Sequence, residues 1–140
     1  MVERDVILAK LATIDRCLAR VLEVRGPRQA ALLAQDVEDI VVLNLQRAAQ
    51  AAIDLAAHVV ASEGYGLPAD LGDTFKLLES HGVIAAALAA RLRRMVGFRN
   101  IAVHQYETLD PRIIDAIVTR HLDDLRDFGA AILTRFAPAP

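Results

Sequence analysis

Four side chains suited to proton transfer or phosphate binding lie within eight residues: Arg99, Asn100, His104 and Tyr106. Histidine exchanges protons near neutral pH, so His104 can take a proton from a ribose 2′-hydroxyl or return one to the leaving oxygen. Arg99 can neutralise the charge that develops on the phosphate, and Asn100 can orient the phosphate or the imidazole. These residues suit metal-free cleavage of a phosphodiester in RNA, because DNA has no 2′-hydroxyl.

The segment that carries these residues is basic, although the whole chain has a formal net charge of -2. No acidic residue occurs between Glu79 and Glu107, and this interval contains four arginines: Arg91, Arg93, Arg94 and Arg99. A run of charge is usually a solvated helix face. The first three arginines therefore have two open interpretations, such a face or a surface that binds an RNA backbone or an acidic protein partner.

Helix geometry limits how Arg99 and His104 can meet. Residues five apart on a straight α-helix point in directions that differ by about 140°, whereas Arg99 and Tyr106 would nearly align. For the arginine and the histidine to converge, the helix must end or bend between Gly97 and Val103, or a second chain must supply the partner. The second option predicts a composite cleft at the two-fold axis of a homodimer. A purely structural alternative also stands, in which these side chains cap helix ends and pair with neighbouring acids.

Length and composition indicate one domain over residues 1–140. Hydrophobic residues make up 54% of the chain, which is enough for a core without disulfides, and the lone Cys17 is expected to lie in that core. Charged residues interrupt the N-terminus, so we expect neither a signal peptide nor a membrane span, and a cytoplasmic protein. Four scattered histidines show no ligand spacing, so we expect no metal site and no cofactor.

The apolar periodicity is helical throughout, and no stretch alternates like a strand. The predicted fold is an all-α antiparallel bundle of four main helices plus one short helix. The expected helices cover residues 3–24, 36–62, 71–80, 85–102 and 111–136. Asp36 is the expected N-cap of the second, and Asp110-Pro111 opens the last. Residues 28–35 are either loop or a helical turn, and 137–140 are expected to form a disordered tail.

Asp54 and His58 interrupt the apolar second helix one turn apart on the same face. They could line the cleft behind Arg99 and His104, but a satisfied hydrogen-bonded pair inside the bundle is the favoured interpretation. His121 lies on the apolar stripe of the last helix and is expected in the core or a dimer interface. His81 precedes a helix-ending glycine and is expected to act as a cap.

The sequence resembles the HepT-like branch of the HEPN superfamily over residues 1–136. The resemblance rests on Asn44-Leu45-Gln46, Asp54, His58, Gly82-Val83-Ile84, Gly97-Phe98-Arg99-Asn100 and Val103-His104-x-Tyr106. The Arg-Asn-x3-His-x-Tyr signature is unbroken here, and it is more specific than an Arg and a His five residues apart. No role for Asp54 or His58 follows from the family pattern.

The resemblance implies an all-α ribonuclease that acts as the toxin of a two-gene, type VII-like toxin–antitoxin system. In such proteins the arginine and histidine at the positions of Arg99 and His104 form the catalytic pair, assembled across a homodimer. The family's antitoxin is an MNT-type nucleotidyltransferase, which binds the toxin and can transfer AMP from ATP to the tyrosine at the position of Tyr106. An AMP there would place a phosphate where the substrate phosphate should lie.

Two other functions remain open at this point. The chain could be a non-catalytic subunit that binds nucleotide or substrate for a nucleotidyltransferase, since that also needs a basic pocket. It could also be a structural helical dimer with a vestigial site, although the intact signature argues against this.

Overall fold

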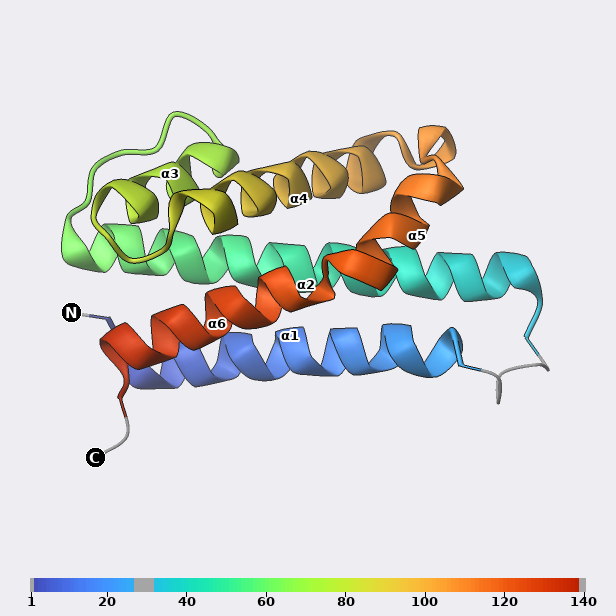
Figure 1. The fold of residues 1–140 in the computed structure, drawn as a ribbon, viewed down its shortest axis with the longest axis horizontal. Coiled ribbons are helices and arrows are strands. Elements are labelled where there is room, and N and C mark those ends of the chain that lie inside the picture. The colour runs from blue at the N-terminus through green and yellow to red at the C-terminus, as the bar shows by residue number, and fades with distance from the viewer. Residues whose placement is uncertain (1, 27–31, 139–140) are drawn as a thin grey trace.

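The computed structural model describes residues 2–26 and 32–138. Within these ranges the chain forms α-helices and one 3-10 turn, with no β-strand (Figure 1). The elements are α1 (Arg4–Val24), α2 (Ala34–Glu63), α3 (Leu71–Ser80), α4 (Ala86–His104), η2 (Tyr106–Thr108), α5 (Pro111–Arg120) and α6 (Leu122–Phe136). The all-α prediction is confirmed.

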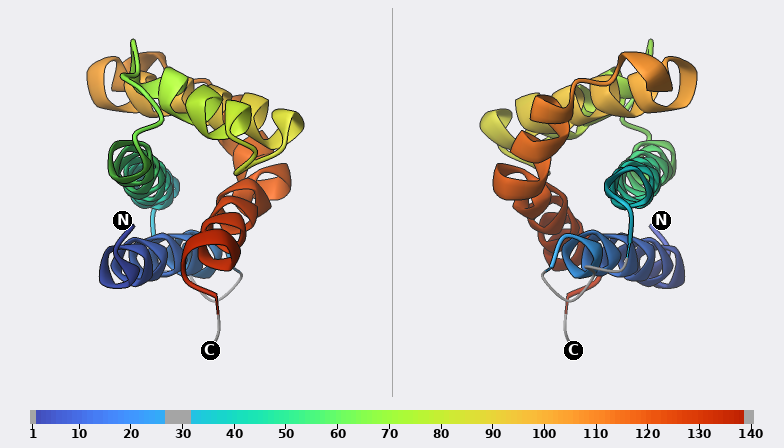
Figure 2. Two further views of the ribbon diagram at one scale, coloured as in Figure 1. Left: turned by 90° about the vertical axis from the view of Figure 1, so that its left-hand side faces the viewer. Right: turned by 90° about the vertical axis from the view of Figure 1, so that its right-hand side faces the viewer.

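Four of these helices surround a common core. Viewed from either end of the long axis, α1, α2, α4 and α6 enclose it, while α3 packs beside α2 and α4 (Figure 2). The longest helix, α2, contacts all three of the other main helices. This arrangement leaves one face of α4 outside the bundle, and that face carries the candidate site.

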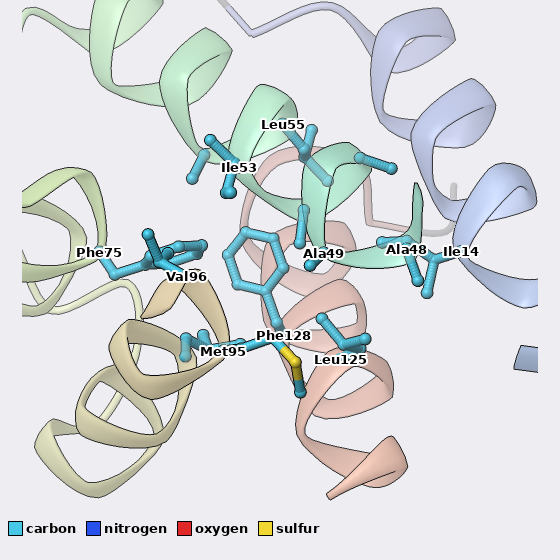
Figure 3. Close-up of a cluster of buried hydrophobic side chains, with 14 of the residues drawn as sticks. Ile14, Ala48, Ala49, Ile53, Leu55, Phe75, Met95, Val96, Leu125 and Phe128 are labelled. Atoms are coloured by element: carbon cyan, nitrogen blue, oxygen red, sulfur yellow. The ribbon is translucent and has the colours of Figure 1, made fainter. Parts of the chain in front are cut away.

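The core combines many alanines with a few large side chains. Phe128 of α6 is fully buried and meets Phe75 of α3 edge to face, with ring centroids 5.4 Å apart (Figure 3). The small side chains of Ala48 and Ala49 bring α2 close to its neighbours, as small residues at helix contacts do. Truncating a buried phenylalanine costs about 3–5 kcal/mol, so this aromatic pair is central to the stability of the bundle. Cys17 is buried too, as expected.

Helix ends follow local sequence signals at some positions. Asp110 accepts a hydrogen bond from the backbone N–H of Arg112, and Pro111 takes the first helical position, as predicted. Gly64 ends α2 with a φ of 67°, a left-handed conformation that favours glycine. The prediction that Asp36 caps α2 is wrong. The helix begins two residues earlier, at Ala34, and Asp36 lies in its first turn, where its charge still favours the helix dipole.

The prediction of one helix over residues 111–136 is wrong, because the chain breaks at His121 into α5 and α6. Figure 1 shows α5 leaving the line of α6 toward the end of α4. Two features favour the break. The Thr119 hydroxyl bonds the carbonyl of Asp115, which often bends a helix. Asp124, in the first turn of α6, is held by side chains outside that helix.

The prediction that the disordered tail includes Ala137 is wrong. Ala137 is buried, and its carbonyl accepts a hydrogen bond of 3.2 Å from Arg4 of α1. Residues 139–140 and residues 28–31 of the ambiguous segment 28–35 lie outside the described residues, while residues 34 and 35 belong to α2. Within the described ranges, no helix is long and apolar enough to cross a membrane.

Candidate active site on helix α4

The outward face of α4 carries a continuous stripe of polar and small residues. Arg93, Gly97, Asn100 and His104 follow one another at steps of four, three and four residues, which places them on one side of a helix. All four are exposed. The opposite side of α4 is apolar and buried, so core packing determines the orientation of this stripe.

Arg99 lies off this stripe but reaches it. Its Nη1 donates a hydrogen bond of 2.9 Å to Oδ1 of Asn100, one turn before His104 on the same face. Its Nε is buried and has no hydrogen-bond partner among the described residues. No carboxylate of residues 2–26 or 32–138 forms an ion pair with Arg99. The guanidinium therefore keeps its full positive charge and an unused donor beside Asn100.

α4 does not end between Gly97 and Val103, so convergence of Arg99 and His104 through a helix end there is contradicted. α4 continues as one helix to His104, two residues beyond the expected end. The side chains of Arg99 and His104 thus leave the helix in directions about 140° apart. The hydrogen bond to Asn100 draws the Arg99 guanidinium toward the face that carries His104.

His104 is the last residue of α4, and its side chain is exposed. No hydrogen bond or ion pair holds its imidazole among residues 2–26 and 32–138. An exposed imidazole without a fixed partner can exchange protons with a bound substrate. The arrangement that the chain offers is thus a positive guanidinium, an oriented amide and a mobile imidazole.

Two grooves border the stripe. One, of about 970 Å³, lies between α3 and α4 and includes Arg93, Arg94, Gly97 and Asn100 in its lining. Neither arginine has a hydrogen bond or ion pair with the described residues. The other groove, of about 730 Å³, lies between α4 and α5 and is largely apolar. The first groove therefore offers two free cations beside Asn100.

Arg91 differs from the other arginines of the run, because it forms an ion pair within the protein. Its Nε donates a hydrogen bond of 2.8 Å to Oδ1 of Asp124, a buried residue of α6. The Nδ1 atom of His121 lies 3.0 Å from the other carboxylate oxygen. Arg91 thus stabilises the α4–α6 packing and the start of α6, and His121 belongs to that ionic cluster at the α5–α6 break.

Asp54 and His58 show no hydrogen bond to each other. Asp54 accepts hydrogen bonds from Lys10 and Gln50, and His58 Nε2 accepts one of 3.2 Å from the backbone N–H of Glu3. Both side chains therefore join α2 to α1. The favoured interpretation as a bonded pair is wrong, and their contacts to α1 give no support to a place in the cleft.

His81 acts as a cap, as expected. Its Nδ1 lies 2.9 Å from the carbonyl oxygen of Leu77, and its ring stacks on Tyr65 with centroids 4.0 Å apart. A search of the described ranges finds no group of three or more His, Cys, Asp or Glu residues placed to hold a metal ion.

Tyr106 has a partner that the sequence pattern did not reveal. It lies in η2, directly after α4, and its hydroxyl donates a hydrogen bond to Oδ1 of Asp39 in α2. This bond, followed by partial burial and the charges of Asp39 and Glu38, raises the pKa of Tyr106 to about 12. In the sequence, Asp39 stands out only as one of several acidic residues near the start of α2. Nothing local indicated a contact across 67 residues.

Comparison with known proteins places the chain in a family. The model of the family "Ribonuclease HepT-like" matches residues 14–132. The mRNA nuclease HepT of Shewanella oneidensis is 40% identical over 124 residues, which cover 89% of this chain and 93% of the relative.

Solved structures agree. A toxin–antitoxin complex with AMP-PNP contains a chain that matches with a TM-score of 0.87 and 37% identity, over 94% of this chain and all of that one. The tri-AMPylated HEPN toxin of Shewanella oneidensis, solved in complex with an MNT antitoxin, matches with a TM-score of 0.87 and 38% identity, over 95% of this chain and 100% of the toxin. With the family match and these relatives together, this chain belongs to the HepT-like ribonucleases.

Proposed function

We propose that this chain, acting as one domain, is a metal-independent endoribonuclease toxin of a type VII-like toxin–antitoxin system. It cleaves RNA in the cytoplasm, with His104 exchanging the proton of the ribose 2′-hydroxyl or leaving oxygen. Arg99 stabilises the charge of the phosphorane, and Asn100 orients Arg99 and the phosphate. The 40% identity to an mRNA nuclease supports the reaction.

The observation that carries the proposal is the state of Arg99. Its guanidinium is fixed by a neutral amide, keeps a buried Nε without a partner and forms no ion pair with the described residues. A buried donor without a partner is costly and therefore uncommon in folded proteins. A phosphate oxygen of bound RNA would satisfy that donor. The free cations of Arg93 and Arg94 extend the same positive surface along the adjacent groove.

The site is completed by a second copy of the chain. Arg99 and His104 diverge on one continuous helix, so a cleft with both groups on one phosphate is best built from two protomers. The apolar groove between α4 and α5 borders the stripe and exposes Ile101 and Ile113 beside it. Burial of these side chains between two copies would bring the two α4 helices together.

The partner that neutralises the toxin is an MNT-type nucleotidyltransferase, which transfers AMP to Tyr106. The support is the relative solved as a tri-AMPylated toxin with its MNT antitoxin, together with the position of Tyr106. Tyr106 is 39% exposed and follows His104 by two residues, so the residue is accessible and close in sequence to the proposed site. A phosphodiester on that oxygen would occupy the positive surface and exclude RNA.

The test is induced expression of the wild type and His104→Ala, each with and without the nucleotidyltransferase. We expect growth arrest from the wild type alone, none from His104→Ala, and an added AMP mass on the co-expressed wild type. The matched control is His81→Ala, which removes a histidine that caps α3 and should stay toxic. Tyr106→Phe should remain toxic and resist modification.

If no variant harms the cell while the purified chain binds nucleotide, the chain is the binding subunit and the toxin proposal fails. Purified wild type should also cleave RNA in the presence of EDTA. Complete inhibition by the chelator would contradict the metal-independent reaction.

A further inference from the structure

The hydrogen bond between Tyr106 and Asp39 joins the η2 turn to α2 at one end of the bundle (Figure 1). The turn is otherwise held by its own backbone, through Thr108 N–H to Gln105 and Leu109 N–H to Tyr106. On the α2 side, Oδ1 of Asp39 also accepts a hydrogen bond of 2.8 Å from Gln35, which lies one helical turn earlier. The carboxylate is therefore oriented by its own helix before it meets the tyrosine.

The contact makes the tyrosine hydroxyl harder to ionise. Asp39 accepts the phenolic proton in a hydrogen bond, and Glu38 adds negative charge nearby, so the pKa of Tyr106 rises to about 12. The hydroxyl is protonated at neutral pH with or without this contact, and a protonated phenol is a weak nucleophile. Attack on phosphorus then requires an acceptor for the proton as the new bond forms. Asp39 already lies at that position.

We propose that Asp39 positions the Tyr106 hydroxyl and accepts its proton when the tyrosine is adenylylated. This inference rests on the proposed role of Tyr106 as the AMP acceptor. The nucleotidyltransferase supplies the nucleoside triphosphate, while the toxin supplies both the nucleophile and the base.

The step balances with the groups named. The Tyr106 oxygen forms a bond to the α-phosphorus of ATP, the bond from that phosphorus to the bridging oxygen breaks, and pyrophosphate leaves. The phenolic proton passes to the Asp39 carboxylate and from there to water.

The product cannot re-form the original contact. The oxygen of an adenylylated tyrosine has no proton to donate, and its phosphodiester brings a negative charge toward Asp39 and Glu38. Modification thus detaches Tyr106 from α2. On α4, Arg93, Arg94 and Arg99 lack an ion pair with the described residues, and their charges attract the phosphate toward the proposed cleft.

The first arm of the test measures the contact without any partner. The chain has two tyrosines and no tryptophan, so in a Tyr65→Phe background the ultraviolet absorbance of phenolate reports Tyr106 alone. At about pH 11 we expect Tyr106 to be roughly one-tenth ionised with Asp39 present. With Asp39→Asn the ionised fraction should be several-fold larger, since the largest cause of the raised pKa is removed and the pKa falls back toward 10. Equal ionisation in the two proteins would overturn the proposal.

The second arm measures transfer of radiolabelled AMP from ATP by the MNT-type nucleotidyltransferase. We expect Asp39→Asn to slow transfer by about 100-fold, because it keeps the size of the side chain and removes its basicity. Asp39→Glu should recover part of the rate. The remaining rate of Asp39→Asn should rise with pH more steeply than the wild-type rate, because the phenol must then ionise first.

The matched control is Asp36→Asn, an exposed acid of the same helix one turn away, which should be labelled at the wild-type rate. Transfer at the wild-type rate in Asp39→Asn would overturn the proposal. If the wild type itself accepts no AMP, Tyr106 is not the acceptor and the role of Asp39 in transfer falls with it. The titration then still shows whether Asp39 holds the hydroxyl, so the two failures remain distinguishable.

Discussion

Each end of α4 has an arginine cluster, in which an arginine bonds a polar side chain that in turn lies beside a histidine. Toward its start, Arg91 and His121 share the carboxylate of Asp124. Asp124 is only 6% exposed, and its two oxygens are both used. The buried carboxylate of Asp124 neutralises Arg91, so this cluster is part of the scaffold.

Toward the end of α4, the third member is Asn100 rather than an aspartate. Its amide orients Arg99 without cancelling the charge, and His104 has no fixed partner in the described part of the chain. The two clusters thus differ in whether the third side chain neutralises the arginine. A buried carboxylate makes it structural, whereas a neutral amide leaves it available for phosphate.

The largest expected effect is on RNA cleavage by the cluster of Arg99, Asn100 and His104, in which the arginine is not neutralised. Arg99→Ala should lower the rate of RNA cleavage by about 100-fold or more, because one stabiliser of the transition-state charge is lost. The thermal midpoint should stay near that of the wild type. Cleavage of an end-labelled RNA measures the effect, with Arg126→Ala as a control, because that exposed arginine pairs with Asp123 on α6. Full activity of Arg99→Ala would remove Arg99 from the mechanism.

A substitution in the cluster of Arg91, Asp124 and His121 should lower the stability of the protein. Asp124→Ala leaves Arg91 and His121 without their acceptor and should lower the free energy of unfolding by about 2 kcal/mol. For a chain of this size that corresponds to a fall of roughly 6 °C in the melting temperature. Urea unfolding followed by circular dichroism gives the value, and exposed Asp123→Ala serves as the control. An unchanged midpoint would mean that the cluster is not part of the scaffold.

Converting one cluster into the other is a sharper test. Asn100→Asp keeps the shape of the side chain but places a carboxylate against Arg99, as Asp124 does against Arg91. We expect cleavage to fall by about 10-fold, because the neutralised arginine attracts phosphate less strongly. Faster cleavage in Asn100→Asp than in the wild type would contradict the comparison.

The smallest effect is expected in the groove between α3 and α4. Arg93→Gln should weaken RNA binding by about threefold at physiological salt. It should also reduce the dependence of log K on log salt by about 0.7, the value for one phosphate contact on a single strand. Fluorescence anisotropy at several salt concentrations measures both quantities. The same substitution at Arg126 should change neither, and an unaltered slope in Arg93→Gln would place the RNA elsewhere.

Patterns in the sequence predicted what depends on near neighbours. Apolar periodicity predicted the helices, and Asp110-Pro111 predicted where α5 begins. The spacing of Arg99, Asn100 and His104 predicted that Arg99 and His104 diverge on a straight helix. Each of these features depends on residues within a turn or two of one another.

Features that depend on distant side chains escaped prediction. The apolar stripe runs unbroken through His121, and the break there reflects Asp124 bonded to a residue 33 positions away. In the sequence nothing distinguishes Arg91 from Arg93 and Arg94, because the carboxylate that it bonds comes from a distant helix. In the same way, His58 was interpreted with Asp54, its neighbour in sequence, whereas its partner is the backbone of Glu3.

The most direct test of the central claim, that Arg99 and His104 form an RNA-cleaving site completed by two protomers, is a mixing experiment. Arg99→Ala and His104→Ala proteins are unfolded together, refolded at equal amounts and assayed for RNA cleavage. If the site is shared between protomers, each mixed dimer regains one intact site, and the mixture should recover about one quarter of wild-type activity. If the mixture is no more active than either variant alone, arginine and histidine do not act across the two protomers.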